Sequence, residues 1–251
     1  MKADPVLAIH GALGSSDELS FLAGSIEGRQ VCFVDVPGHG TACEHPAACD
    51  FEATLEALEA RLPERTCLFG YSMGARLALA LTLRAPTRIS ALVLESGHAG
   101  LAAHERAERL RFDALRAAEL RACPERFFDA WLRRPPFLDL PEAQRAALSS
   151  RRARRAGELG VDGLARALVG LSIGAQPELW QRLPELRLPV LLVTGQRDEK
   201  FCAIASLMAA GIRDAEHVVI QGAGHNVHLE APTQLLDALN EFLGRRTRGR
   251  T

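Results

Sequence analysis

The chain has 251 residues, of which 47% are hydrophobic, and this length and composition suit one α/β domain with an insertion. Its formal net charge of −1 creates no overall field that would draw it to nucleic acid or to a membrane surface. No apolar stretch reaches the ~18–20 residues that a membrane span needs, and the first residues carry no apolar signal segment.

The six cysteines form no Cys-x-x-Cys pair and no cluster of the kind that disulfide-rich proteins show. Such a pattern suits a reducing compartment. Together with the absence of a signal segment, it predicts a cytoplasmic protein.

Apolar runs that are typical of strands alternate with helical patterns along most of the chain. The runs are short and continuously apolar, as expected for strands buried on both faces of a sheet. They occupy residues 6–9, 31–34, 67–69, 91–94, 190–193 and 217–220. Helical patterns occupy residues 50–62, 72–85, 201–211 and 232–243. This alternation predicts a mostly parallel, doubly wound sheet with right-handed crossovers.

The alternation breaks between about residues 100 and 188. This stretch is rich in Ala, Leu, Arg and Glu, and its pattern indicates several helices without a convincing strand. Because it interrupts the sheet between two strands, we expect it to lie above the carboxyl ends of the strands as a helical lid. The predicted organisation is a core of residues 1–100 and 188–246, a cap of 101–187, and a frayed basic tail of 247–251.

A Gly-x-Ser-x-Gly turn stands between a predicted strand and a predicted helix, with Ser72 at its centre. This turn forces the serine out above the end of a parallel sheet, and residues larger than Gly70 and Gly74 would clash there. The start of the helix directs free N–H groups and a positive dipole end toward any negative charge beside the serine. Ser72 is therefore the candidate catalytic serine.

Two further polar residues follow later strands, Asp198 after residues 190–193 and His225 after residues 217–220. The chain order serine, aspartate, histidine is that of an α/β-hydrolase triad. A serine hydroxyl needs an imidazole to take its proton, and the imidazole needs a carboxylate to fix its tautomer. The alternative is an aspartate that only caps the next helix and a structural histidine in a glycine-rich loop.

The segment after the first predicted strand, residues 10–14, holds two glycines. In such folds this loop supplies one N–H of an oxyanion hole, and the residue after the serine supplies the other. The predicted donors are the backbone amides of Met73 and of Ala12 or Leu13. A plain glycine turn at the strand end is the alternative.

Other patterns point less clearly to chemistry. Histidines and cysteines within residues 39–49 match no standard zinc spacing, so we predict no metal site and no cofactor. The arginines of residues 151–155 have acidic neighbours and no aromatic platform, which favours a solvated helix over nucleic-acid contact. Trp131 and Trp180 suit either lid packing or a ligand pocket.

With these motifs in place, the chain resembles the 2-succinyl-6-hydroxy-2,4-cyclohexadiene-1-carboxylate synthases of menaquinone biosynthesis, a branch of the α/β-hydrolase superfamily. The segments that carry the resemblance are residues 9–14, 34–40, 70–79, 95–101, 174–180, 194–201 and 222–232. The most particular are Arg76 after the serine turn, the Gln-Pro-x-Leu-Trp stretch at 176–180 and the Gly-His-Asn-Val-His stretch at 224–228. Leu132 departs from the family, which often has tyrosine there.

The resemblance implies a lyase that eliminates pyruvate from 2-succinyl-5-enolpyruvyl-6-hydroxy-3-cyclohexene-1-carboxylate. Ser72 would act as a base that His225 and Asp198 activate, and the oxyanion hole would hold the enolate. The polyanionic substrate needs fixed cations, and the planar fork of arginine matches carboxylates. The substrate-binding residues that the resemblance implies are Tyr71, Arg76, Arg109, Trp131 and, for a third arginine, Arg151 or Arg152.

Two other functions stay open. A carboxylesterase or a C–C bond hydrolase would use the same three residues through an acyl-serine, but the arginine-rich insertion suits a polyanion better than a neutral ester. A ligand receptor on this fold is disfavoured by the intact Ser72, Asp198 and His225. The expected partner is a small polyanionic substrate, with no nucleic acid and no membrane. The sequence leaves the oligomeric state open and favours a monomer.

Overall fold

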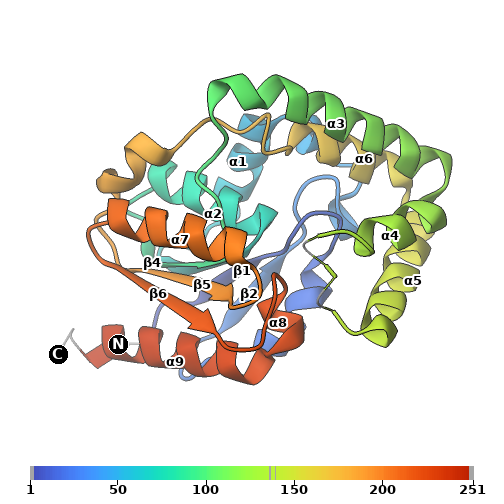
Figure 1. Cartoon of the computed structure of the whole chain (residues 1–251). Helices are drawn as coiled ribbons and strands as arrows, with labels where there is room; N and C mark the ends of the chain where they lie inside the picture. The colour runs from blue at the N-terminus through green and yellow to red at the C-terminus, as the bar shows by residue number, and fades with distance from the viewer. Residues whose placement is uncertain (1–2, 136, 139, 249–251) are drawn as a thin grey trace.

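The computed structural model describes residues 3–135, 137–138 and 140–248. Within these residues six parallel strands form one sheet in the order β2-β1-β3-β4-β5-β6 (Figure 1). The strands are β1 Val6–Ile9, β2 Val31–Val34, β3 Thr66–Tyr71, β4 Ile89–Glu95, β5 Val190–Gly195 and β6 Ala215–Ile220. The predicted parallel sheet is confirmed, and each predicted run falls inside one strand.

Helices cover both faces of the sheet. They are α1 Phe51–Glu59, α2 Met73–Arg84, α7 Glu199–Gly211, the short α8 Val227–Glu230 and α9 Pro232–Arg248, with 3-10 segments η1 Ser16–Leu22, η2 Gly40–Ala42 and η3 Pro46–Cys49. Because strand side chains alternate in direction, Leu7 and Ile9 pack with α1, α2 and α7, whereas Val6 and Ala8 pack with η1 and α9. Figure 1 shows α9 on the opposite side of the sheet from α2 and α7.

Helix α9 is longer than its apolar pattern predicts. It runs to Arg248 and so includes residues 247 and 248, while the frayed tail of 247–251 stays a prediction. Arg245 pairs with Glu241 one turn earlier and with Glu216 of β6, and these ion pairs support the last turns. Residues 249–251 lie outside the described residues.

The segment between β4 and β5 is helical in its described part and contains no strand there. Its helices are α3 Ala103–Ala122, α4 Pro124–Leu132, α5 Glu142–Leu159 and α6 Val161–Gly170, followed by the 3-10 segment η4 Trp180–Glu185. Helices α3–α6 gather to one side of the sheet in Figure 1. We call them the lid; the residue bounds given above for core and cap stay a prediction.

The lid has a hydrophobic cluster of its own. Leu120, Phe128 and Leu168 come from three different lid helices and pack together, and Leu13 from the loop after β1 completes the cluster. The lid therefore rests on the sheet partly through this one loop. None of the helices in the described part of the chain is both long and apolar enough to span a membrane.

Candidate active site

Ser72 lies at the turn between β3 and α2. Its backbone has φ 51° and ψ −105°, a region that residues other than glycine rarely adopt. A Cβ atom at Gly70 would lie 2.4 Å from the carbonyl oxygen of Gly74, and one at Gly74 would lie 2.1 Å from that of Ile9. Only glycine fits two positions before and two positions after the serine, so the sequence enforces this turn.

The structure brings Ser72, His225 and Asp198 together from three loops at one edge of the sheet. His225 Nε2 lies 3.1 Å from Ser72 Oγ, and His225 Nδ1 lies 2.6 Å from Asp198 Oδ2. The other carboxylate oxygen of Asp198 accepts a hydrogen bond from the N–H of Phe201 at 3.4 Å, at the start of α7. Asp198 therefore both caps a helix and orients the imidazole.

The surroundings of His225 hold its ring in one orientation. Ser96 Oγ donates a hydrogen bond of 2.9 Å to the His225 carbonyl oxygen, and the Phe201 ring lies edge-on at 4.5 Å between ring centroids. The His225 side chain is only 2% exposed. With Asp198 at Nδ1, the other ring nitrogen is left to accept a proton from Ser72.

Ala12 and Leu13 of the loop after β1 line the same cavity as Ser72. Leu13 has φ 61°, and its N–H donates to Nε2 of His39 at 3.1 Å, so it is already engaged. Among the residues that the structure describes, the amides of Ala12 and Met73 have no hydrogen-bond partner. Because the Leu13 amide is engaged, the geometry favours Ala12 over Leu13 as the candidate donor with Met73.

Two buried histidines brace this loop through their ring nitrogens. His10 Nε2 accepts a hydrogen bond from the N–H of Val36 at 3.0 Å, as His39 Nε2 does from Leu13. Burial lowers the pKa of both rings, and with the nearby His10 it lowers that of His39 to about 3. Both rings are therefore neutral acceptors. The described residues contain no group of three or more His, Cys, Asp or Glu side chains placed to hold a metal ion.

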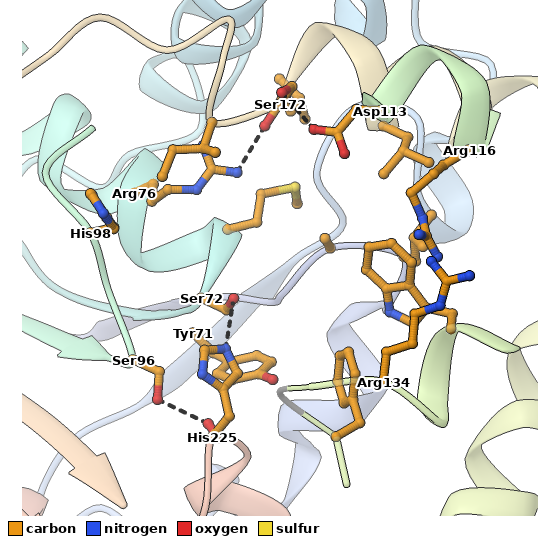
Figure 2. A pocket seen from close by; sticks show the side chains of 18 of the residues that line it. Tyr71, Ser72, Arg76, Ser96, His98, Asp113, Arg116, Arg134, Ser172 and His225 are labelled. Atoms are coloured by element: carbon orange, nitrogen blue, oxygen red, sulfur yellow. Dashed lines mark hydrogen bonds between the residues drawn. The ribbon is translucent and has the colours of Figure 1, made fainter. Parts of the chain in front are cut away.

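A cavity of about 310 Å³ opens in front of Ser72, between the strand-end loops and the lid (Figure 2). Among the predicted site residues, those that line it are Ala12, Leu13, Tyr71, Ser72, Met73, Arg76, Arg109, Trp131, Arg152 and His225. Asp198 does not line the cavity and pairs with His225 instead. Arg151 and Trp180 lie outside the cavity lining, and the Trp180 indole N–H donates to the Gly100 carbonyl oxygen at 2.9 Å.

Arg76 and Arg109 place positive charge on one wall of the cavity. The Arg76 guanidinium is buried and donates to Gln176 Oε1 at 2.7 Å and to the Leu171 carbonyl oxygen at 2.8 Å. Burial, followed by the positive charge of Arg109, lowers the pKa of Arg76 to about 9, which leaves it charged at neutral pH. Arg109 Nε donates to Asp113 Oδ2 at 2.7 Å. An anion in the cavity would relieve the repulsion between the two arginines.

The third predicted arginine is paired with an acid that the sequence did not indicate. Nε and Nη2 of Arg152 donate to the two carboxylate oxygens of Glu18 at 2.9 and 2.8 Å, and both side chains are buried. Arg151 lies 3.6 Å from the same carboxylate, but its side chain is 47% exposed. The structure thus separates the two candidates, because only Arg152 reaches the cavity.

Further basic side chains line the cavity and were not predicted. Besides His39, they are His98, Arg116, Arg134 and Lys200. His98 and Lys200 follow strands, so the signal that indicated Asp198 could also have found them. Arg116 and Arg134 lie among many lid arginines, and no sequence signal tells which of these face inward.

The chain is similar to known proteins over nearly its whole length. The alpha/beta hydrolase fold family matches residues 4–232. A Salmonella agona (strain SL483) protein named 2-succinyl-6-hydroxy-2,4-cyclohexadiene-1-carboxylate synthase is 33% identical over 247 residues, covering 96% of this chain and 94% of its own. A Bacillus subtilis (strain 168) protein that carries this name provisionally is 35% identical over 251 residues, covering 96% of this chain and 90% of its own.

Solved structures extend the comparison to three dimensions. The structure of MenH from S. aureus superimposes with a TM-score of 0.89 at 30% identity, covering 98% of this chain and 96% of that chain. An enol-lactonase from Burkholderia xenovorans LB400 has a TM-score of 0.78 at 18% identity, covering 97% of this chain and 92% of that chain. The second likeness concerns the fold alone.

Proposed function

Because the chain belongs to the 2-succinyl-6-hydroxy-2,4-cyclohexadiene-1-carboxylate synthases, a branch of the alpha/beta hydrolase fold family, we propose that Ser72, His225 and Asp198 perform its reaction as a carbon–oxygen lyase. Its role is that of a synthase in menaquinone biosynthesis. The observation that carries the proposal is the hydrogen-bonded line from Ser72 through His225 to Asp198, beside a cavity with arginines in its wall.

The proposed reaction starts with removal of a ring proton beside the succinyl carbonyl group. Ser72 Oγ takes this proton while its own proton passes to His225 Nε2, and Asp198 stabilises the resulting imidazolium. The electron pair moves onto the carbonyl oxygen to form an enolate. A serine hydroxyl can act as a base in this way only because the neutral imidazole, 3.1 Å away, receives its proton in the same step.

The second half of the reaction breaks the carbon–oxygen bond to the enolpyruvyl group. The enolate re-forms its carbonyl group while a C2=C3 double bond forms in the ring. The existing C3=C4 double bond shifts to C4=C5, the C5–O bond breaks and the enolpyruvyl oxygen leaves with the bonding electrons. His225 returns its proton to the released enolpyruvate, which gives pyruvate. The amides of Met73 and Ala12, which have no hydrogen-bond partner among the described residues, are the donors for the enolate oxygen. The sequence of steps ends with Ser72 and His225 in their starting states.

The cationic wall favours this substrate over the neutral ester of a carboxylesterase. Arg76 is buried with neutral hydrogen-bond partners, and an uncompensated buried charge is costly unless an anion joins it. A substrate with several carboxylates supplies such anions. Every group that the proposed reaction uses comes from one chain, so no second subunit is required. A cytoplasmic location is part of the proposal, and the free cysteines fit a reducing compartment.

Incubation with the cyclohexene precursor tests the reaction class directly. We expect one pyruvate per substrate consumed and an unmodified protein mass throughout turnover, because elimination forms no bond between Ser72 and the substrate. Pyruvate is measured by a coupled assay and the protein by intact mass spectrometry. An acyl adduct on Ser72 with no pyruvate, together with fast hydrolysis of nitrophenyl esters, would show that the protein is an esterase and not a lyase.

Replacing Arg76 with glutamine is expected to lower kcat/KM for pyruvate release by about 10- to 100-fold, because a charge-assisted contact to a substrate carboxylate contributes roughly 1.5–3 kcal/mol. Arg84→Gln, at the exposed end of the same helix, is the matched control and should change kcat/KM little. Steady-state kinetics measure both. Equal effects of the two substitutions would remove Arg76 from the site.

A further inference from the structure

Arg116 points from the middle of α3 into the cavity with its charge unpaired. Its side chain is buried, and its guanidinium lies over three aromatic rings, 4.7 Å from the Trp131 centroid, 5.0 Å from that of Phe112 and 5.6 Å from that of Phe127. Such rings attract and orient the planar cation, but they do not neutralise it. The rings therefore hold Arg116 ready for an anion without supplying one.

Arg134, just after α4, brings a second positive charge to the same place. Figure 2 shows the guanidinium groups of Arg116 and Arg134 close together, on the other side of the cavity from Arg76 and His98. Burial, and next the positive charge of Arg134, lower the pKa of Arg116. The acidic side chains of Glu119 and Asp113 raise this pKa, but by less. Both arginines line the cavity.

Neither guanidinium of this pair is satisfied within the described residues. Arg116 Nε is buried and has no hydrogen-bond partner, and no described carboxylate forms a salt bridge with either arginine. Two arginines that face each other without an acid repel, unless an anion lies between them. Arg76 and Arg109, by contrast, are both engaged in hydrogen bonds with protein groups.

We propose that Arg116 and Arg134 together bind one carboxylate of the substrate, one that remains in the product, in a subsite separate from Arg76 and Arg109. The product name, a succinyl cyclohexadiene carboxylate, implies a ring carboxylate and a succinyl carboxylate. Two arginine forks can share one carboxylate through parallel N–H···O bonds, which would also satisfy the buried Nε of Arg116. This subsite selects ligands that carry anions at both ends of the cavity. The inference rests on the proposed function.

Equilibrium binding to an inactive enzyme tests the subsite without turnover. In a Ser72→Ala background, Arg134→Gln and Arg116→Gln should each raise the substrate Kd by about 10-fold, as loss of one charge-assisted contact does. Because both arginines would hold the same carboxylate, the double variant should raise the substrate Kd by less than the product of the two single increases. Arg111→Gln on α3 and Arg126→Gln on α4, both exposed and outside the cavity lining, are the matched controls. Calorimetry measures each Kd.

Kinetics and product analogues give the second measurement. With Ser72 intact, the same substitutions should raise KM about 10-fold and change kcat less than about 3-fold. The product and its two mono-amides then serve as inhibitors. One mono-amide should bind the wild type and Arg134→Gln equally, because it lacks the carboxylate that the subsite holds. Arg134 is exposed, so its replacement leaves the fold intact even where Arg116→Gln does not.

An unchanged substrate Kd in Arg134→Gln would overturn the subsite, as would an equal loss of affinity for the product and both mono-amides. Failure of the proposed function is a different result. In that case the wild type releases no pyruvate and the Ser72→Ala protein does not bind the substrate, whatever residue stands at 116 or 134.

Discussion

Replacing Ser72 with alanine is expected to lower kcat for pyruvate release by at least about 100-fold, because the proton then has no acceptor linked to His225. The geometry supports a large loss. Ser72 Oγ lies 3.1 Å from His225 Nε2, and a methyl group in its place neither accepts nor passes on a proton. Ser150→Ala on the exposed face of α5 is the matched control. Stopped assays of pyruvate under saturating substrate measure kcat.

The same assay applies to His225 and Asp198. His225→Ala and Asp198→Ala should each lower kcat by at least about 100-fold. The double variants should lower kcat little more than the more damaging single substitution does, since the effects of residues that act as one unit are not additive. Losses that multiply across the three positions would mean that these side chains act independently. Near wild-type turnover by Ser72→Ala would remove serine from the mechanism.

Replacing Glu18 with glutamine is expected to destabilise the protein by about 3–5 kcal/mol, because it leaves a buried arginine without its counter-charge. The side chains of Glu18 and Arg152 are 3% and 4% exposed, so water cannot take the place of the carboxylate. Urea unfolding measures the change. Glu158→Gln serves as the control, since its partner Arg154 is exposed and the pair lies on the surface. If Glu18→Gln and Glu158→Gln lowered the free energy of unfolding by the same amount, the buried pair would stabilise the protein no more than the surface pair does.

The Glu18 pair also predicts how stability depends on pH. Burial raises the pKa of Glu18, but the attraction and hydrogen bonds of Arg152 outweigh it and lower the pKa from 4.5 to about 2. A carboxyl whose pKa is depressed on folding stabilises the protein above its unfolded pKa. This stabilisation should be complete above about pH 5 and be lost as the pH falls from 4.5 toward 2, so the gap in unfolding free energy between wild type and Glu18→Gln should narrow over that range.

The core and the three polar residues could be predicted because their signals are local. Short apolar runs mark strands buried on both faces. The Gly-x-Ser-x-Gly turn admits only glycine at positions 70 and 74, as the backbone contacts there show. Asp198 and His225 follow because the carboxyl ends of parallel strands meet at one edge. None of these inferences depends on how helices that are distant in the sequence pack together.

The rest of the site depends on packing between segments that are far apart in the chain, and the periodicity of the sequence does not reveal such packing. Glu18 and Arg152 meet across 134 positions, and nothing in either neighbourhood indicates the other. The lid is so rich in arginine that its pattern does not tell Arg116, which faces the cavity, from Arg111, which faces water. The choice between Ala12 and Leu13 rested on one hydrogen bond, from Leu13 to His39, that only the folded loop displays.

Leu13 belongs to two parts of the molecule at once. Its side chain completes the hydrophobic cluster of the lid, and its backbone, bound to His39, sets the turn that presents the neighbouring amide of Ala12. The lid and the candidate oxyanion hole are therefore coupled through a single residue. A substitution that removes the Leu13 side chain would weaken the packing of the lid and, through the same backbone, disturb the turn that carries Ala12. Neither part of the molecule can be altered at this position without the other.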